Sequence, residues 1–157
     1  MKVKVLFTGK TSTDWIRRGV EDYASRIGHY VSFELTEIPD LKQASSLTQD
    51  QVRQKEGEAI LKQVRPGDFL VLLDERGDVF SSVDWARNLE RMAAHLPKDI
   101  VFAVGGPYGF SKQVYDRGNQ KLSLSRMTFS HQLVRLVFLE QLYRAFTIIK
   151  GEPYHHE

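Results

Sequence analysis

The sequence contains no cysteine in its 157 residues, and this absence removes several classes of site at once. Disulfide bridges, thiolate zinc sites and cysteine nucleophiles all need a thiol. No apolar run approaches the roughly 20 residues that a membrane-spanning helix needs. The amino-terminal stretch MKVKVLFTGK holds too few consecutive apolar residues for the core of a signal peptide. Together these absences predict a cytoplasmic protein with no membrane partner.

A large excess of one charge sign is also missing. Lys and Arg number 22 and Asp and Glu number 20, so the formal net charge is only +2. A protein that binds nucleic acid through phosphate contacts alone carries a stronger positive charge. If RNA is the substrate, its shape or a composite surface from two subunits must therefore contribute to binding.

What the sequence does have is an alternation of strand and helix patterns from end to end. The patterns predict strands over 3–7, 31–38, 69–74, 100–106 and 121–125, and helices over 13–27, 48–64, 85–96, 112–117 and 131–149. Strands separated by helices indicate an α/β fold with a mostly parallel sheet that is covered on both sides. No repeat or linker interrupts the pattern, so we expect residues 1–157 to form a single domain.

Local signals mark several boundaries of these elements. Thr13 can cap the first helix, and Thr48 and Gln51 have the spacing of a capping box. A turn is predicted over 76–78, a mobile loop over 41–47, and Pro97 is expected to close the helix that buries Trp85, Leu89, Met92 and Leu96.

The last predicted helix is unusual because it is apolar on nearly every side. Beyond its first turns, only a strip with Glu140, Gln141, Arg144 and Thr147 stays polar. A helix of this kind must be buried on two sides. A central helix in one core would satisfy this, but a subunit interface suits a chain of this size better. Glu140 and Arg144 then form either an ordinary i,i+4 ion pair or a functional charge pair near the dimer seam.

Three segments that follow predicted strands are expected to meet at one edge of the sheet. They are 73–77, the glycine-rich loop GGPYG over 105–109, and 124–129. Ligands of open α/β sheets bind beyond the carboxyl ends of the strands, so these segments predict one pocket. Each signal is weak alone, because tight turns explain most glycine-rich loops and Met127 and Phe129 are typical core residues.

The carboxyl-terminal tail concentrates aromatic and imidazole groups in Tyr154, His155 and His156. A frayed terminus is the ordinary explanation, but Pro153 stiffens this tail. With His131 these histidines could suggest zinc, yet their spacing matches no known ligand pattern. We therefore predict no metal site.

Taken together, VFAVGGPYGF, SLSRMTFSHQLVRLVFLEQLYRAF and GEPYHHE resemble the ribosomal large-subunit pseudouridine N3-methyltransferases, the RlmH family of the SPOUT class. The resemblance covers the whole chain and is densest in its last third. It implies an α/β fold with a C-terminal trefoil knot, S-adenosyl-L-methionine as methyl donor, and a homodimer with active sites at the subunit interface. The implied substrate is a pseudouridine in the helix 69 loop of 23S rRNA, methylated at N3 in the assembled 70S ribosome.

The resemblance also implies roles for individual residues. The cofactor site would consist of Leu73, Gly105, Leu124, Ser125, Arg126, Met127, Thr128 and Phe129, acting chiefly through backbone groups. From the chemistry of methyl transfer to N3, we further hypothesise that Arg144, Tyr154, His155 and Glu140 carry catalysis. His155 would accept the N3 proton or orient the base, which Tyr154 would contact, while Arg144, held by Glu140, would stabilise the developing anion.

Two positions depart from the pattern of the family. Ser130 stands where some members have proline, which predicts a looser entry to the last helix. His156 replaces the usual arginine or lysine and removes a phosphate contact at neutral pH. Two other functions stay open: a non-catalytic ribosome-binding dimer of the same fold, and a methyltransferase of the same class acting on tRNA. The intact GGPYG loop and PYH tail favour the rRNA enzyme.

Overall fold

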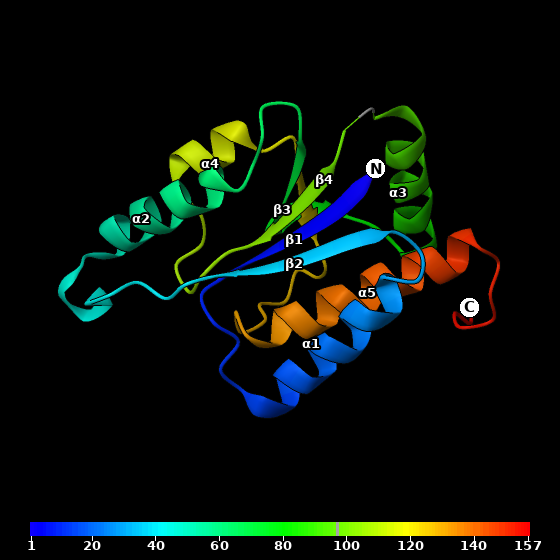
Figure 1. The fold of residues 1–157 in the computed structure, drawn as a ribbon, viewed down its shortest axis with the longest axis horizontal. Coiled ribbons are helices and arrows are strands. Elements are labelled where there is room, and N and C mark those ends of the chain that lie inside the picture. The colour runs from blue at the N-terminus through cyan, green and yellow to red at the C-terminus, as the bar shows by residue number, and fades with distance from the viewer. Residues whose placement is uncertain (97) are drawn as a thin grey trace.

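A computed structural model describes residues 1–96 and 98–157. Its five strands pair in parallel in the order β2-β1-β4-β3-β5 (Figure 1). The strands are β1 (Lys2–Thr8), β2 (Ser32–Ile38), β3 (Phe69–Val79), β4 (Ile100–Val104) and β5 (Gln120–Ser123). The helices are α1 (Asp14–Ile27), α2 (Gln49–Lys62), α3 (Ser82–His95), α4 (Lys112–Arg117) and α5 (Leu133–Ile149), with one 3₁₀ turn over Ala44–Ser46. The predicted α/β fold with a parallel sheet is confirmed.

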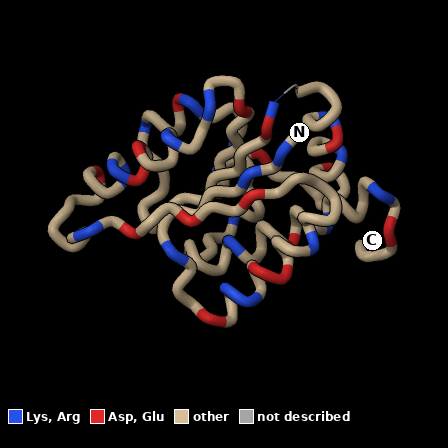
Figure 2. The backbone as a smooth tube through the Cα atoms, in the orientation of Figure 1, with Lys and Arg blue, Asp and Glu red and all other residues tan. Residues whose placement is uncertain are grey.

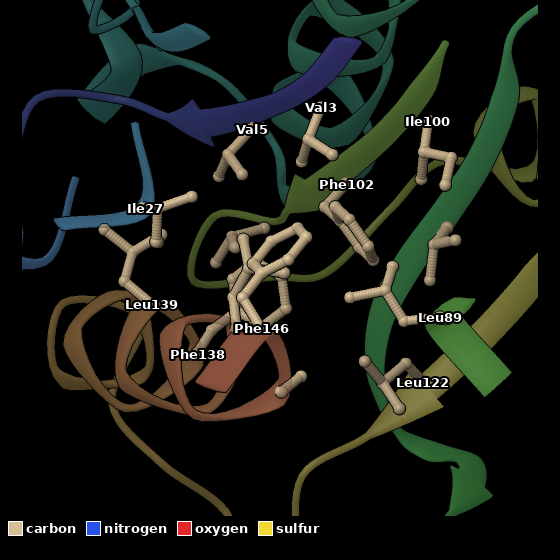
Figure 3. Packing of buried hydrophobic residues seen from close by; sticks show 14 of the residues in the cluster. Val3, Val5, Ile27, Leu89, Ile100, Phe102, Leu122, Phe138, Leu139 and Phe146 are labelled. Carbon is tan, nitrogen blue, oxygen red and sulfur yellow. The ribbon is translucent and has the colours of Figure 1, made fainter. Parts of the chain in front are cut away.

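Helices cover both faces of the sheet and divide the apolar core into two layers. α1, α3 and α5 pack on one face, and α2 and α4 cover the other (Figure 1). In the larger layer, Phe138 and Phe146 of α5 point toward Phe102 of β4 (Figure 3). The rings of Phe102 and Phe138 have centroids 5.1 Å apart. β4 is buried along its whole length because both of its faces are covered, which explains its continuous apolar run.

α5 lies between α1 and α3, so neighbours within the chain cover much of its apolar circumference. Gly19 of α1 lets Leu136 approach so closely that a β-carbon there would lie 2.7 Å from Cδ1 of Leu136. The side of α5 that faces away from the sheet stays partly exposed, and we call it the outer strip: Leu133, Val137, Glu140, Arg144 and Ile148. Neighbours within the chain therefore cover much of the apolar surface for which the sequence predicted a subunit interface.

The turn predicted over 76–78 is wrong, because β3 continues through these residues to Val79. The pairing of β3 with β5 shifts register between Leu73 and Asp78. Gly77 makes this irregularity possible: a β-carbon on it would lie 2.6 Å from the carbonyl carbon of Lys121 in β5. The shift lets Asp74, Glu75 and Arg76 leave the ladder at the edge where the predicted pocket lies.

The predicted boundaries of the helices are confirmed in part. The capping box of Thr48 and Gln51 forms as predicted, with both hydrogen bonds present. Thr13 occupies the N-cap of α1, but its side chain makes no capping hydrogen bond, and Trp15 points to solvent with 56% of its surface exposed. Pro97, expected to close α3, lies outside the described residues.

Candidate active site

A cavity of about 650 Å³ opens at the carboxyl edge of the sheet, in the size range of small-molecule sites. The three predicted segments meet there, because parallel strands end at the same edge. Its lining comes from β3, β4, the loops after β4 and β5, and the start of α5: Leu73 to Arg76, Val104 to Phe110, Leu122, Leu124, Ser125 and Met127 to His131 and Val134, with Arg53 of α2 and Tyr115 of α4.

Seven of the eight predicted cofactor residues line this cavity: Leu73, Gly105, Leu124, Ser125, Met127, Thr128 and Phe129. Arg126 is not among the lining residues. Its guanidinium donates to the carbonyl oxygen of Glu75 at 2.6 Å. The side chain of Arg126 thus anchors the loop to β3 rather than facing the cavity.

The loop after β5 is held in place by Glu75. The hydroxyl of Thr128 donates to the Glu75 carboxylate at 2.6 Å, and the Ser123 hydroxyl lies 3.1 Å from the Glu75 carbonyl oxygen. Within the loop, the amide of Met127 donates to the Ser125 hydroxyl at 3.0 Å. These bonds give the irregular loop a single shape, which a site built on backbone groups requires.

Arg135 is a residue that the sequence reasoning missed. Its side chain is completely buried, and four of its N–H groups donate to the carbonyl oxygens of Thr8, Gly9 and His131 and to the Thr11 hydroxyl, at 2.8 to 3.1 Å. Arg135 therefore clamps the end of the cavity-lining loop to the end of β1. The available signal was one arginine on an otherwise apolar stretch, LVRLVF.

Two titratable groups on the cavity wall stay neutral near pH 7. Burial, helped by the positive charge of Arg135, lowers the pKa of His131 from its ordinary value. Burial, together with a hydrogen bond of 2.7 Å to Asp74, raises the pKa of Tyr115 to about 12. The Asp74 carboxylate on this wall therefore accepts a hydrogen bond from Tyr115, whose phenol stays neutral.

The predicted catalytic residues form a second cluster, at the other end of α5. Glu140 forms an ion pair with Arg144 and accepts a hydrogen bond of 3.1 Å from the hydroxyl of Tyr154. Arg144 lies 3.1 Å from Nδ1 of His155, and its guanidinium carbon stands 4.8 Å from the centre of the Tyr154 ring. The tail is therefore packed back on α5 rather than frayed, and all four residues come together.

The hydrogen bond between Arg144 and His155 fixes the chemistry of the imidazole. A guanidinium can only donate, so Nδ1 of His155 accepts and the neutral ring carries its proton on Nε2. Burial, with a hydrogen bond to Tyr23, raises the pKa of Tyr154 well above its ordinary value. The phenol of Tyr154 thus stays protonated, and the free edge of His155 is a hydrogen-bond donor.

Within one chain the two clusters stay apart. Val134 lines the cavity, and Arg144 follows ten residues later on the same helix. At 1.5 Å per residue this separates them by about 15 Å along α5. The cavity and the tail cluster of a single chain therefore cannot act on the same atom of a substrate.

Ser130 and His156, the two positions that depart from the family pattern, differ in their surroundings: Ser130 is hydrogen-bonded to the start of α5, whereas His156 is exposed. The Ser130 hydroxyl accepts the amide N–H of Leu133 at 3.1 Å, and the Ser130 carbonyl accepts that of Val134 at 3.0 Å. Ser130 thus joins the turn over 131–132 to the first residues of α5. The looser helix entry stays a prediction. His156 is exposed beyond the cluster.

Comparison with known proteins gives a consistent result over the full length. The family model described as "Predicted SPOUT methyltransferase" matches residues 1–155. The chain belongs to the SPOUT methyltransferase family. It is similar to proteins named ribosomal RNA large subunit methyltransferase H from Parabacteroides distasonis (50% identical), Bacteroides fragilis (48%) and Christiangramia forsetii (49%). The matched regions cover 99–100% of both chains in each case.

A SPOUT methyltransferase needs a methyl donor of the S-adenosylmethionine type, and the cavity fits such a group. Leu73, Leu124 and Phe129 offer apolar surface for a flat ring, while Asp74 and Glu75 offer negative charge to a sulfonium or an ammonium. In the described part of this SPOUT methyltransferase, no group of three or more His, Asp or Glu side chains could hold a metal ion. Over the same residues, no helix is long and apolar enough to cross a membrane.

Proposed function

We propose that this SPOUT methyltransferase works as a homodimer and methylates N3 of a pseudouridine in the helix 69 loop of 23S rRNA in the assembled 70S ribosome. The names of the full-length relatives support the rRNA substrate. The observation that carries the proposal is the division of the site: each chain holds a complete cavity and a complete tail cluster that it cannot bring together.

Two-fold pairing along α5 would join the two halves. If the two-fold axis of the dimer lies perpendicular to α5, the two copies of this helix run antiparallel. A crossing near the middle of α5 would set Arg144 beside Val134 of the partner subunit, at the rim of the partner's cavity. The outer strip suits this seam, because Leu133 and Val137 supply apolar contact on either side of the partner's charge pair.

The cavity would hold S-adenosylmethionine between Leu73, Gly105 and the loop 124–129, chiefly through backbone groups. When bound, the cofactor supplies a methyl group that its sulfonium already activates. Gly105 matters because a side chain there would reach toward the space that the ligand needs and press on the Phe110 ring, 3.3 Å from the position of a β-carbon.

The tail cluster would prepare the nucleophile. The N3 imide of pseudouridine is a poor nucleophile while protonated, so transfer requires loss of that proton and alignment of the base. Arg144 would stabilise the anion that develops on the imide, and Tyr154 would stack on or hydrogen-bond the base. The bond from Arg144 to Nδ1 favours orientation of an imide oxygen by Nε2–H of His155 over proton abstraction. The N3 proton would leave to water, and N3 would then accept the methyl group as the C–S bond of the sulfonium breaks and a neutral thioether is released.

The proposal includes the C-terminal trefoil knot within a single domain of residues 1–157. Its support is the path between β5 and α5. This stretch contacts Glu75 of β3 and then, through the Arg135 clamp, Gly9 after β1. It thus runs from the edge strand β5 past β3 to the end of β1.

The test is methyl transfer from labelled S-adenosylmethionine to 70S ribosomes, free rRNA or tRNA, followed by mapping of the label. We expect label at one pseudouridine of the helix 69 loop, with assembled ribosomes as the best substrate. If the label were found on tRNA instead, the substrate would be tRNA rather than 23S rRNA. Stable ribosome binding without any transfer would favour a non-catalytic assembly dimer.

A further inference from the structure

Tyr108 sits at the tip of a rigid turn on the rim of the cavity. The amide of Gly109 donates to the carbonyl oxygen of Gly106 at 3.1 Å, and Gly109 adopts a φ of +78° that suits glycine. Pro107 restricts the turn further. The turn therefore fixes the backbone from which the Tyr108 ring projects, and 45% of the residue remains exposed. An aromatic ring displayed on a fixed turn is preorganised for stacking.

Arg53 of α2 stands behind this turn. One of its guanidinium nitrogens lies 3.4 Å from the carbonyl oxygen of Tyr108, and its side chain is 28% exposed. Arg53 also forms an i,i+3 ion pair with Asp50, whose side chain is 88% exposed. Such an exposed pair is worth little, so Asp50 can yield to a stronger anion.

A second arginine, Arg76, lines the same wall of the cavity. The positive charges of Arg76 and Arg53 both act on the hydroxyl of Tyr115, which lines the cavity with them. Two carboxylates share the lining: Asp74 accepts from Tyr115 and Glu75 accepts from Thr128, so each is held in place beside the space for the cofactor. In addition to these carboxylates, the lining offers two arginines and one exposed ring to whatever enters the cavity.

We propose that Tyr108, Arg53 and Arg76 form an RNA-binding rim beside the cofactor cavity. Tyr108 stacks on an unpaired base next to the reacting nucleotide, and the two arginines bind the flanking phosphates. RNA loops are recognised through splayed bases that stack on aromatic side chains, with arginines along the backbone. A base that reacts at N3 must leave its stack to reach the cavity, which places its neighbours at this rim.

The proposed rim also explains how a chain with a formal net charge of only +2 can bind RNA. Figure 2 shows basic and acidic positions interspersed along the backbone, in line with a formal net charge of only +2. A stacked base supplies affinity that does not depend on net charge. The inference rests on the proposed rRNA substrate and adds the residues that would bind it.

The experiment measures equilibrium binding of the full chain to 70S ribosomes, which needs no turnover. Tyr108→Ala should weaken binding about tenfold, in line with the loss of one stacked base. Tyr108→Trp should bind like the wild type, whereas Tyr108→Leu should bind like Tyr108→Ala. Arg53→Ala and Arg76→Ala should each lower the slope of log K against log salt by about 0.7, the value for one single-strand phosphate. Arg87→Ala is the matched control, because Arg87 forms a similar i,i+3 pair with Asp84 on α3, away from the cavity.

Two results would overturn the rim. In one, Tyr108→Ala or Tyr108→Leu binds ribosomes as tightly as the wild type. In the other, the Tyr108 variants dissociate the dimer, which would make the ring a contact of the partner subunit's tail. Methyl transfer by the wild type, measured in parallel, judges the proposed function separately: ribosome binding without transfer would reject the enzyme and still leave the rim decided by the binding series.

Discussion

At the scale of single residues, the tail cluster shows how a neighbour sets the role of a histidine. Arg144 occupies Nδ1 of His155, so the edge of the ring that can meet a substrate carries a proton. Tyr154 cannot replace it as a base, because burial keeps the phenol protonated. Under the proposed function the cluster would hold and polarise an imide, and Glu140 forms the ion pair that keeps Arg144 in place.

This arrangement predicts different outcomes for two substitutions of His155. Gln can still donate a hydrogen bond, so His155→Gln should retain methyl transfer within about tenfold of the wild type. His155→Ala removes the donor and should reduce the rate by about 10². Single-turnover transfer to ribosomes at saturating cofactor measures both rates. Equal losses in the two variants would mean that His155 acts as the base after all.

A second prediction at this scale concerns Glu56 of α2. Burial, with a smaller contribution from Asp40, raises the pKa of Glu56, and its buried Oε1 has no hydrogen-bond partner in the described chain. The folded protein therefore holds this proton when the unfolded chain has already lost it, and stability falls as pH rises from about 4.5 through the raised pKa. Glu56→Gln removes this loss.

We expect Glu56→Gln to melt about 2 °C higher than the wild type at pH 7, and the difference to vanish near pH 4. Thermal unfolding followed by circular dichroism across this pH range measures it. Glu58→Gln, on the exposed side of the same helix, is the control and should shift neither value. A lower melting temperature for Glu56→Gln at pH 7 would contradict the argument.

At the scale of elements, the sequence predicted most where the signal was local. The capping box of Thr48 and Gln51 and the apolar run of β4 depend only on neighbours in the chain, and both are confirmed. The turn predicted over 76–78 failed because the pairing of Gly77 with β5 overrides a local turn signal. Arg135 and Arg53 were missed because their partners lie far away in the sequence.

Gly105, which follows β4 and lines the cavity, allows a test of the proposed cofactor site. Gly105→Val should abolish binding of S-adenosylmethionine, measured by calorimetry, because its side chain would fill the approach to the backbone. It should also cost some stability, since a β-carbon there already lies 3.3 Å from the ring of Phe110. Gly28→Ala, which meets only ordinary contacts at 3.4 Å or more, serves as a glycine control. Unchanged cofactor affinity in Gly105→Val would mean that the pocket is misassigned.

α5 yields a further prediction through its outer strip. Val137 is partly exposed and does not pack against the core, unlike Phe138, which is fully buried, or Leu136, which packs on α1. Val137→Glu should therefore produce a folded monomer without methyl transfer, whereas a charge at Phe138 would unfold the chain. Sedimentation together with circular dichroism separates the two outcomes. A stable dimer of Val137→Glu would place the seam elsewhere.

At the scale of the whole molecule, the decisive property is that each proposed active site takes its parts from two chains. His155→Ala removes a residue of the tail cluster and leaves the cavity intact. Gly105→Val fills part of the cavity and leaves the tail cluster intact. The Gly105→Val homodimer should transfer no methyl groups, and the His155→Ala homodimer should keep only about 1% of the wild-type rate. In a heterodimer of the two, one site combines the intact cavity of the first chain with the intact tail of the second, and the other site carries both defects.

Coexpression of the two variants in equal amounts should therefore restore about a quarter of wild-type activity, because half of the dimers are mixed and one of their two sites works. Differently tagged chains allow the heterodimer to be purified, and its activity should be about half that of the wild type. The prediction depends on the separation of about 15 Å along α5, which prevents one chain from completing its own site. If each site were built within a single chain, every site in the heterodimer would carry one defect, and purified heterodimer would be as inactive as either parent.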